Sequence, residues 1–365
     1  MALETETDCR YYGACSGCGY TFSQINIEKQ TKLHTLDQLT SEWPHRPQIK
    51  YQNFSVYERD RLDFVVENGN VGLWSDKQKQ IVDLPHCQLL HPQLMDYLDK
   101  FRKIKWPVKK GSFRLRRGWQ GISGAWLDFS NLDIKSLLES QTELRELLSI
   151  STHVEIGQKH KSLVSDAANT ELKLKDPQFF PWWCSIHGGN SVPLFCTVGD
   201  FTQPSQFANH WILEKMQSWF SEIKPNTVIE LGAGIGNMTV ALAPLAKSYT
   251  AIENNPSNIK SLTENMNRYH SPSFELLEKN FHQEGSYAPS DLILANPARS
   301  GLGSGMESIL KNPPSNFIYM SCFPETWAAD CQQLIQQGYQ AQELWVVNQF
   351  PLTQHFEVLS LFKKI

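Results

Sequence analysis

Hydrophobic and polar positions alternate between strand-like and helix-like patterns in the second half of the chain. The apolar run Thr227–Leu231 predicts a strand, and the glycine-rich sequence Gly232–Asn237 predicts a tight loop before a helix over Met238–Leu245. A second strand over Ser248–Ile252 leads directly to Glu253. Strand, glycine loop, helix, strand and acid in this order are typical of a nucleotide-binding βαβ unit.

Four further apolar runs predict strands, and the last two are placed to form a hairpin: Asp291–Ala295, Asn316–Cys322, Glu343–Val347 and Glu357–Phe362. Ahead of the glycine loop, apolar residues at helical spacing predict a helix that packs into the core: Phe207, Trp211, Met216, Trp219 and Phe220. Alternating strands and helices predict an α/β, Rossmann-like fold. The G-x-G-x-G form of the loop, with an acid before it, favours S-adenosylmethionine over a dinucleotide as the ligand.

The chain length sets the expected number of domains. A chain of 365 residues accommodates roughly two domains of ordinary size. We expect a smaller α+β domain over residues 1–190 and the α/β domain over residues 191–365. The boundary is placed near the Pro- and Trp-rich stretch Asp176–Pro193. The glycine loop and the later strands then all fall in the second domain, which is expected to hold the ligand.

The composition describes a globular protein without a membrane anchor. Hydrophobic residues make up 41% of the chain and charged residues 20%. No run approaches the roughly 18 consecutive apolar residues that a membrane helix needs. The first residues, Met1–Asp8, are acidic and lack an apolar core, so they do not form a secretory signal. We therefore expect a cytoplasmic monomer whose thiols stay reduced.

Cations gather in one segment, although the chain as a whole carries a net charge of −4. The segment contains no acid, and its cations are Arg102, Lys103, Lys105, Lys109, Lys110, Arg114, Arg116 and Arg117. Trp106, Phe113 and Trp119 are interleaved with them. Cations bind phosphates and aromatic rings stack on unpaired bases, so residues 102–117 predict an RNA-binding surface. The alternative is an ordinary strand pair whose long basic side chains lie along apolar surface.

Cysteines near the amino terminus have the spacing of an inorganic centre. Cys9, Cys15 and Cys18 follow the pattern C-x5-C-x2-C, and Cys87 is the best-placed fourth ligand. Four thiolates suit either zinc or an iron–sulfur cluster. Zinc sites usually consist of two close pairs, so an arrangement of three plus one favours iron–sulfur. The alternative is a set of unconnected cysteines in a reduced protein.

A single cysteine near the carboxyl terminus is the strongest catalytic candidate. Cys322 follows the apolar run Asn316–Met320 and precedes Pro324, which places its thiol at the end of a strand. Open α/β sheets hold their ligands at that edge. A thiol beside a cofactor, with a carboxylate such as Glu357 nearby, is suited to covalent catalysis followed by proton abstraction. The alternative is a buried cysteine that acts only as a small hydrophobic residue.

These motifs together resemble those of the RNA 5-methyluridine methyltransferases that carry a 4Fe–4S cluster. The resemblance covers nearly the whole chain and includes the four cysteines, the glycine loop and Glu253. It also includes Asp200-Phe201-Thr202-Gln203-Pro204, Asn296-Pro297-Ala298-Arg299, Ser321-Cys322-Phe323-Pro324-Glu325-Thr326 and His355-Phe356-Glu357. Many family members begin with an oligonucleotide-binding barrel, which is expected to be missing here because the cysteines begin at residue 9.

The resemblance implies a role for each matched residue. Cys322 adds to C6 of a uracil, C5 takes a methyl group from S-adenosylmethionine, and Glu357 removes the C5 proton. Asn296 and Arg299 contact the base. The cofactor site is lined by Gln203, Gly232, Asn237, Glu253 and Asn280. The 4Fe–4S cluster is held by Cys9, Cys15, Cys18 and Cys87 and shapes an RNA-binding domain. The target is a single-stranded or flipped-out base in rRNA or tRNA.

Asn296 departs from the family pattern, in which an aspartate opens this turn and binds the N3–H of uracil. An asparagine still offers its carbonyl to N3–H and its amide to O4, and in the flipped orientation it suits cytosine. Three functions stay open: a uridine C5 methyltransferase of rRNA or tRNA, an enzyme that methylates cytosine or another RNA site, and a weakly catalytic RNA- and cofactor-binding protein. The complete set of motifs favours the first.

Overall fold

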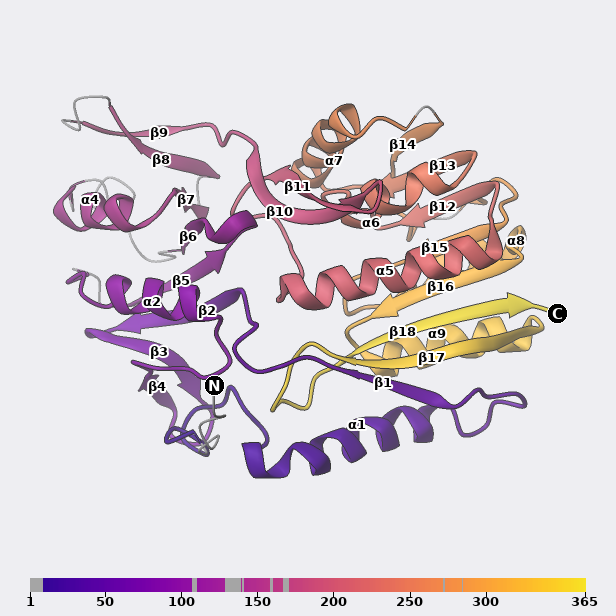
Figure 1. The fold of residues 1–365 in the computed structure, drawn as a ribbon, viewed down its shortest axis with the longest axis horizontal. Coiled ribbons are helices and arrows are strands. Elements are labelled where there is room, and N and C mark those ends of the chain that lie inside the picture. Colours follow the sequence, from indigo (N-terminus) through magenta and orange to yellow (C-terminus); the bar gives the residue numbers. More distant parts are fainter. Residues whose placement is uncertain are drawn as a thin grey trace. The chain divides into compact units, whose positions relative to one another are not determined.

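The computed structural model describes residues 9–106, 110–128, 139, 141–157, 160–166, 171–271, 273–283 and 285–365. The chain forms two compact units, each built from three separate stretches (Figure 1). Unit 1 comprises Met1–Ser23, Ser55–Cys184 and Phe195–Phe207, and unit 2 comprises Gln24–Phe54, Ser185–Leu194 and Ala208–Ile365. The expected boundary at residue 190 therefore lies in a short stretch of unit 2, and Gln24–Phe54 belongs to unit 2 instead of the first domain.

Unit 2 is built on an eight-stranded sheet with the strand order β1-β17-β18-β16-β15-β12-β13-β14. The strands are β1 (Ile49–Asn53), β12 (Thr227–Leu231), β13 (Ser248–Glu253), β14 (Phe274–Glu278), β15 (Leu292–Ala295), β16 (Asn316–Ser321), β17 (Tyr339–Asn348) and β18 (Glu357–Lys364). Neighbouring strands are parallel, except that β18 is antiparallel to both β16 and β17. The order changes direction between β12 and β15, and doubly wound sheets bind their ligands at such a point.

The strands predicted from apolar runs are confirmed. Every residue of β15 is buried, and in β12 and β16 only the first residue is partly exposed. Parallel strands covered by helices on both faces are buried in this way, which explains why their sequences read as continuous apolar runs. The predicted hairpin of the last two runs is the antiparallel pair β17–β18, although β17 begins four residues earlier than expected.

Helices cover both faces of this sheet (Figure 1). They are α1 (Ile25–Leu39), α5 (Gln206–Ile223), α6 (Asn237–Leu242), α7 (Pro256–Arg268), α8 (Gly305–Lys311) and α9 (Pro324–Gln336), with short 3-10 turns over Phe22–Gln24 and Ala243–Leu245. Residues of α1, α8 and α9 share one core with Leu344 of β17. The next residue, Trp345, contacts Trp211 of α5 instead. Successive strand residues point to opposite faces, so α5 covers the face opposite α1 and α9.

The apolar stripe of α5 is confirmed as core packing, with one exception. Met216, Trp219 and Phe220 are buried. Phe207 lies in the first turn of the helix and is 53% exposed, so its assignment to the core was wrong. The 3.6-residue period marks the inner face of a helix but not the depth at which each end of the helix is covered.

The segment α1–β1 adds an edge strand that the sequence pattern did not indicate. β1 pairs in parallel with β17, with Ile49 opposite Leu344 and Asn53 opposite Asn348. The helix α1 packs against β1, β17 and α9. Residues 49–53 therefore form the edge strand of a sheet whose other strands all lie between residues 227 and 364.

Unit 1 is built on a second eight-stranded sheet with the order β4-β3-β2-β5-β6-β7-β8-β9. The strands are β2 (Arg61–Glu67), β3 (Asn70–Ser75), β4 (Gln80–Asp83), β5 (Lys110–Arg117), β6 (Ser123–Asp128), β7 (His153–Ile156), β8 (Lys161–Ser165) and β9 (Leu172–Lys175). The pairs are antiparallel except β6–β7. Among its described residues, this unit also contains the helices α2 (Pro92–Phe101) and α4 (Gln141–Ile150) and a 3-10 turn over Trp119–Gly121.

The core of unit 1 follows from the strand and helix periods of its sequence. In β2 every second residue is buried, and these residues join the same core as the apolar face of α2. The amino terminus of α2 is capped by His91, whose Nδ1 accepts a hydrogen bond from the Gln93 N–H, and Pro92 is its first residue. The α+β character expected for the first half of the chain is therefore present.

Besides the passages before Gln24 and after Phe54, the chain passes between the units in a short hairpin and in the first turn of α5. The hairpin consists of β10 (Phe180–His187) and β11 (Asn190–Cys196). Only Gly188 and Gly189 separate the two strands, and both have positive φ, at 57° and 77°. A two-residue hairpin loop of this kind requires positive φ at both positions, which glycine adopts without strain.

Candidate active site

The candidate catalytic and cofactor residues of unit 2 lie at one edge of its sheet. The glycine loop follows β12, Glu253 ends β13, Asn296 follows β15 and Cys322 follows β16. These four strands run in parallel, so their carboxyl ends meet at the same edge. β18 runs in the opposite direction, which brings its first residue, Glu357, to that edge as well.

The strand register places Cys322 beside Glu357. Ser321 is paired with Val358 across the antiparallel strands β16 and β18. Cys322 is the next residue after Ser321, and Glu357 is the residue before Val358. The two residues therefore lie opposite each other, one position beyond the last pair of the ladder. The Glu357 carboxylate acts on the Cys322 thiol, and Arg299 acts on both groups. The thiol, the carboxyl group and the guanidinium therefore form one cluster.

The thiol of Cys322 is held back from ionising by its surroundings. Burial raises its pKa above the ordinary value, and the neighbouring Glu357 carboxylate raises it further. Arg299 acts in the opposite direction, because its guanidinium lowers the pKa both through its charge and by a hydrogen bond to the thiol. A contact of Arg299 with the nucleophile was not indicated by the sequence, which assigned this residue to the substrate base.

Glu357 is a buried carboxyl group whose pKa lies close to neutral pH. The residue is 5% exposed. Burial raises its pKa to about 7, and the contributions that lower it are a hydrogen bond from Gln349 and the charge of Arg299. A carboxylate with a pKa near the working pH is well suited to take up a proton during a reaction.

Gln349 is a partner of Glu357 that the sequence analysis missed. Its Nε2 donates a hydrogen bond of 3.0 Å to Glu357 Oε1, and both residues are buried. Gln349 lies in the loop between β17 and β18, one residue after β17 ends at Asn348. A glutamine next to a predicted strand carries no signal by itself, since the contact depends on how the loop folds back.

The glycine loop adopts backbone conformations that other residues rarely reach. Gly232, Gly234 and Gly236 have φ values of 75°, 59° and 88°. A Cβ atom on Gly232 would lie 3.3 Å from the carbonyl oxygen of Asn296, so the loop and the Asn296 turn are in close contact. Gly236 also precedes the first residue of α6, whose amino terminus offers N–H groups to an anionic ligand group.

Glu253 is fixed in position by backbone N–H groups. Its Oε2 accepts from Gly234 N–H at 2.8 Å, and its Oε1 accepts from the N–H groups of Asn254 and Asn255, both at 2.8 Å. A carboxylate has about four lone-pair sites, so one site on Oε2 remains for a ligand hydroxyl group. The carboxylate thereby links the glycine loop after β12 to the end of β13.

Two of the remaining predicted cofactor residues belong to unit 2 and one does not. Asn237 forms a reciprocal amide pair with Asn209, in which Asn237 Nδ2 donates to Asn209 Oδ1 at 2.6 Å. Asn280 lies after β14, and its side-chain oxygen accepts from His282 N–H at 3.0 Å. Gln203 is buried in unit 1. Its contribution to a cofactor site therefore stays a prediction.

The four candidate cluster cysteines lie near one another in unit 1. All four are half-buried. Burial, together with the charges of Cys87, Cys15 and Cys9, raises the pKa of Cys18 to about 12. Among the residues that the structure describes, no three His, Cys, Asp or Glu side chains are arranged closely enough to hold a metal ion as they stand. The four cysteines are therefore close to one another, but among the described residues their side chains do not form a coordination site for a single metal ion.

Much of the basic segment is engaged within unit 1. Arg102 forms a bidentate ion pair with Asp83. Arg116 is buried and donates a hydrogen bond of 2.7 Å to the Asp200 carbonyl oxygen. Arg117 and Lys110 pair with Asp60 and Glu67. Trp106 and Phe113 belong to the hydrophobic core, so the expectation that they stack on bases is wrong. Lys109 lies outside the described residues.

Several side chains of this unit remain exposed and able to meet a polyanion. Lys103 and Lys105 lie on the surface after α2. Arg114 and Trp126 are half-buried, and the Arg114 guanidinium lies 4.2 Å from the centre of the Trp126 ring. Arg61 lies on the neighbouring strand, 5.9 Å from the ring of Phe201, which is 62% exposed. These are the cation and aromatic pairs that the sequence segment alone could not identify.

Comparisons with known proteins agree with this geometry. Residues 273–365 match the family described as tRNA (Uracil-5-)-methyltransferase. Residues 205–288 match the family described as ribosomal RNA adenine dimethylase. The first match contains Asn296, Cys322 and Glu357, and the second contains the glycine loop and Glu253.

Over nearly its whole length the chain is similar to RNA methyltransferases. It is 37% identical over 376 residues to "Uncharacterized RNA methyltransferase Bd2056" of Bdellovibrio bacteriovorus, a match that covers 99% of this chain and 96% of that protein. It is 25% identical over 377 residues to the 23S rRNA (uracil(1939)-C(5))-methyltransferase RlmD of Aliivibrio fischeri, which covers 98% of this chain and 82% of the relative.

A solved structure shares the fold. The tRNA (uracil-54, C5)-methyltransferase of Pyrococcus abyssi, in complex with S-adenosyl-L-homocysteine, matches with a TM-score of 0.70 at 17% identity. The match covers 95% of this chain and 84% of that chain. Among the described residues, none of the helices combines the length and the apolarity that crossing a bilayer requires.

Proposed function

We propose that this chain, which belongs to the S-adenosylmethionine-dependent RNA uracil-C5 methyltransferases of rRNA and tRNA, uses Cys322 and Glu357 as its catalytic pair. The observation that carries the proposal is the cluster of thiol, guanidinium and carboxyl group at the sheet edge that also carries the glycine loop. Uracil C5 is a poor nucleophile toward a sulfonium methyl group. A covalent bond at C6 supplies the activation that positioning alone does not.

In the first step the Cys322 thiolate forms a bond to C6 of the uracil. The electrons of the C5–C6 double bond move toward C5 and the O4 carbonyl, so C5 becomes enolate-like. Arg299 supports this step, because its hydrogen bond and its charge favour the thiolate over the thiol. S-adenosylmethionine, when bound, supplies the methyl group that C5 takes up.

In the last step Glu357 accepts the C5 proton. The C5–C6 double bond forms again, the bond between Cys322 Sγ and C6 breaks, and the thiolate is released. The pKa of Glu357, raised to about 7 by burial, makes the carboxylate a stronger base than an exposed glutamate. The elimination rate should therefore rise with pH up to about 7 and level off above it.

The cofactor is proposed to lie against the glycine loop. Gly232, Gly234 and Gly236 let the backbone approach the ligand closely, and the fixed Glu253 carboxylate is suited to accept from a ribose hydroxyl group. Asn237 and Asn280 lie at the same edge of the sheet and are proposed to contribute polar contacts.

Asn296 is proposed to read the target base. Its backbone lies close to Gly232 and bonds to Leu231, which supports a position near the glycine loop. The amide can accept the N3–H of uracil and donate to O4. The flipped amide suits cytosine, so RNA cytosine methylation is the second candidate function.

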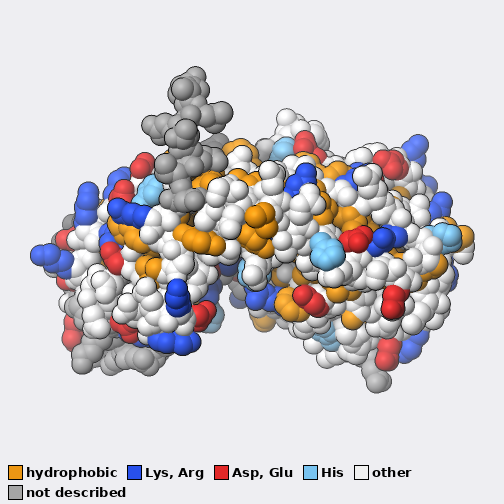
Figure 2. Space-filling model, turned by 90° about the horizontal axis from the view of Figure 1, so that it is seen from below, with side chains coloured by type: hydrophobic (Ala, Val, Ile, Leu, Met, Phe, Trp, Pro, Cys, Tyr) orange, Lys and Arg blue, Asp and Glu red, His pale blue; other side chains and the backbone are white. Residues whose placement is uncertain are grey.

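RNA is proposed to bind through a few specific side chains of unit 1 instead of a broad positive patch. On the face drawn in Figure 2, Lys and Arg side chains are interspersed with Asp and Glu and with hydrophobic groups. The exposed Lys103 and Lys105 are suited to phosphates, and the Arg114–Trp126 pair is suited to stack on an unpaired base.

Cys9, Cys15, Cys18 and Cys87 are proposed to hold a 4Fe–4S cluster. The surroundings fit such a group, because the Gly17 N–H donates to Cys15 Sγ at 3.3 Å and the Leu89 N–H bonds to the Cys87 thiol. Arg59 adds a positive charge next to Cys18 and Cys87. A cluster of four irons is wider than a single ion, so it accepts thiolates that one ion leaves out of reach. Its role is proposed to be structural.

Iron analysis tests the cluster. Protein purified without oxygen should be brown and contain about four irons per chain, as expected for one such cluster. A colourless protein with one zinc per chain would instead identify a zinc site.

Mass spectrometry of nucleosides tests the reaction. RNA from a strain that lacks the protein is incubated with the protein and methyl-labelled S-adenosylmethionine, then digested to nucleosides. The proposal predicts label in 5-methyluridine. Label in 5-methylcytidine would instead select the second candidate, and no label in any rRNA or tRNA fraction would contradict both.

A further inference from the structure

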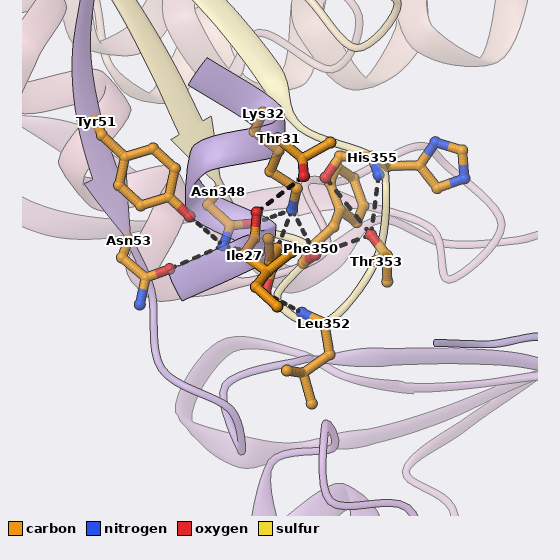
Figure 3. A network of polar contacts seen from close by, with 11 residues as sticks. Ile27, Thr31, Lys32, Tyr51, Asn53, Asn348, Phe350, Leu352, Thr353 and His355 are labelled. Atoms are coloured by element: carbon orange, nitrogen blue, oxygen red, sulfur yellow. Dashed lines mark hydrogen bonds and ion pairs between the residues drawn. The ribbon is translucent and has the colours of Figure 1, made fainter. Parts of the chain in front are cut away.

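A buried ion pair lies in unit 2 next to the loop that carries Gln349 (Figure 3). Glu28 and Lys32, one turn apart in α1, are each 1% exposed, and Lys32 Nζ lies 2.6 Å from Glu28 Oε1. Burying two charges costs free energy that their mutual attraction alone does not reliably offset, so such a pair needs further polar partners. All of the further partners described below lie in β1 or in a segment that starts at the last residue of β17, Asn348, and continues into the loop toward β18.

Lys32 and Glu28 hold this segment, residues 348–352, at three points. Lys32 Nζ donates to Asn348 Oδ1 at 2.6 Å and to the Phe350 carbonyl at 3.3 Å. Glu28 Oε2 accepts from the Leu352 N–H at 3.0 Å. Leu352 has a φ of 61°, a conformation that leucine rarely adopts and that persists only where the surroundings fix it.

Asn348 joins the pair to the edge strand β1. Its Nδ2 donates to Glu28 Oε1 at 2.9 Å, to the Tyr51 hydroxyl at 2.9 Å and to Asn53 Oδ1 at 2.8 Å. The side chain of Asn348 therefore contacts α1 and β1 at once (Figure 3). The residue that follows it in the chain, Gln349, donates to Glu357.

We propose that the Glu28–Lys32–Asn348 network is a positioning device for proton abstraction, which holds Gln349 against the carboxyl group of Glu357. The inference rests on the proposed role of Glu357. The loop is fixed immediately before Gln349, through Asn348, and immediately after it, through Phe350 and Leu352. Gln349 then orients one carboxylate oxygen of Glu357 by its hydrogen bond and leaves the other for the C5 proton. Gln349 and the network act through Glu357 and do not themselves touch the base.

Two reactions of the same enzyme separate this role from general stability. On uridine RNA, turnover needs both Cys322 and Glu357. On 5-fluorouridine RNA the C5 substituent cannot leave as a proton, so formation of the covalent complex reports the Cys322 steps without Glu357. A device that positions Glu357 should influence the first reaction and leave the second nearly unchanged.

The variants are Gln349→Leu, which removes the contact with Glu357, and Lys32→Met, which removes the ion pair. A Glu28→Gln, Lys32→Met double variant leaves no buried charge without a partner and serves if the single variant does not fold. Lys215→Met is the matched control, because Lys215 pairs with Glu343 at 3.0 Å in the same unit without contact to residues 348–352.

Gln349→Leu and Lys32→Met should each lower uridine turnover about tenfold and change the rate of fluorouridine trapping by less than about twofold. The groups that face Glu357 are Cys322, Arg299 and Gln349. Loss of the Gln349 hydrogen bond raises the proton affinity of Glu357, so the acid limb of turnover should move about one unit to higher pH. Lys215→Met should leave the acid limb and the ratio of the two reactions unchanged.

The inference is overturned if the network variants lower both reactions equally, or if their pH profiles match that of Lys215→Met. A failure of the proposed function looks different. In that case the parent protein forms no fluorouridine complex, or Glu357→Gln turns over uridine RNA at the parent rate.

Discussion

At the scale of single residues, the site balances two groups that oppose each other. The Cys322 thiol must lose a proton to attack, and the Glu357 carboxylate beside it makes that loss harder. Arg299 lowers the pKa of both groups, so one guanidinium favours the ionised form of nucleophile and base together. The motifs around Cys322 and Glu357 made both residues predictable from sequence. The contact of Arg299 with the thiol and that of Gln349 with the carboxylate were not predictable, because each depends on how a loop folds back.

A neutral residue at position 357 should alter stability in a pH-dependent way. The folded protein binds the Glu357 proton more tightly than the unfolded chain, since its pKa rises from 4.5 to about 7. The stability linked to this proton is full below pH 4.5 and is lost as pH rises through 7. Relative to the parent, Glu357→Gln should therefore gain up to about 3 kcal/mol in free energy of unfolding between pH 4.5 and pH 8. Urea unfolding across this range measures it, and a pH-independent difference would show that the carboxyl group is not buried as described.

Asn296→Asp tests how the base is read. An aspartate accepts from uracil N3–H with a full charge, so kcat/KM on uridine RNA should be unchanged or up to about tenfold higher. Transfer of labelled methyl groups to RNA provides the measurement. A sharp loss of turnover would indicate that the amide is adapted to another base.

At the scale of elements, the glycine loop and the residues at the sheet edge could be predicted because each of them directly follows the apolar run of its strand in the sequence. β12, β13, β15 and β16 follow this rule. α1 does not, because Glu28 and Lys32 in it have the spacing of an exposed helix pair and are in fact buried against a loop more than 300 residues later. The periodicity of apolar residues indicates which face of a helix is apolar. It does not indicate whether another segment covers the polar face.

Gly236→Ala tests the fit of the glycine loop. Gly236 has a φ of 88°, and an added Cβ would lie 2.7 Å from Leu262 Cδ1. Gly338→Ala is the control, because Gly338 has a φ of 84° and nothing within 4 Å of an added Cβ. Both variants should lose about 1 kcal/mol in free energy of unfolding. Only Gly236→Ala should also bind S-adenosylhomocysteine about tenfold more weakly by calorimetry. Equal affinities in the two variants would argue against cofactor binding at this loop.

At the scale of the whole molecule, the chain is interleaved between its two units. Gln24–Phe54 supplies α1 and β1 to unit 2, and the chain returns to unit 1 at Ser55. A two-domain organisation was predictable from length and motif order. The exchange of segments was not, since it is fixed by long-range strand pairing such as that of Asn53 with Asn348. The core positions of Trp106 and Phe113 were hidden for the same reason: a segment rich in cations and aromatics does not show which side chains face inward.

Cys15→Ser tests whether the cysteine cluster serves unit 1 alone. The variant should lose most of its iron and bind RNA at least about fivefold more weakly, while its affinity for S-adenosylhomocysteine stays within about twofold. Cys184→Ser, which alters a buried cysteine of unit 1 outside the cluster, should keep its iron. Loss of cofactor affinity equal to the loss of RNA affinity would contradict a role confined to unit 1.

The most direct measurement is covalent capture of 5-fluorouridine RNA in the presence of S-adenosylmethionine. The parent protein should form a complex that survives denaturation, and peptide mapping should place the RNA on Cys322. Cys322→Ala should form none, while Glu357→Gln should form it at nearly the parent rate. A complex that persists in Cys322→Ala, or that maps to another residue, would contradict the assignment of this thiol as the nucleophile.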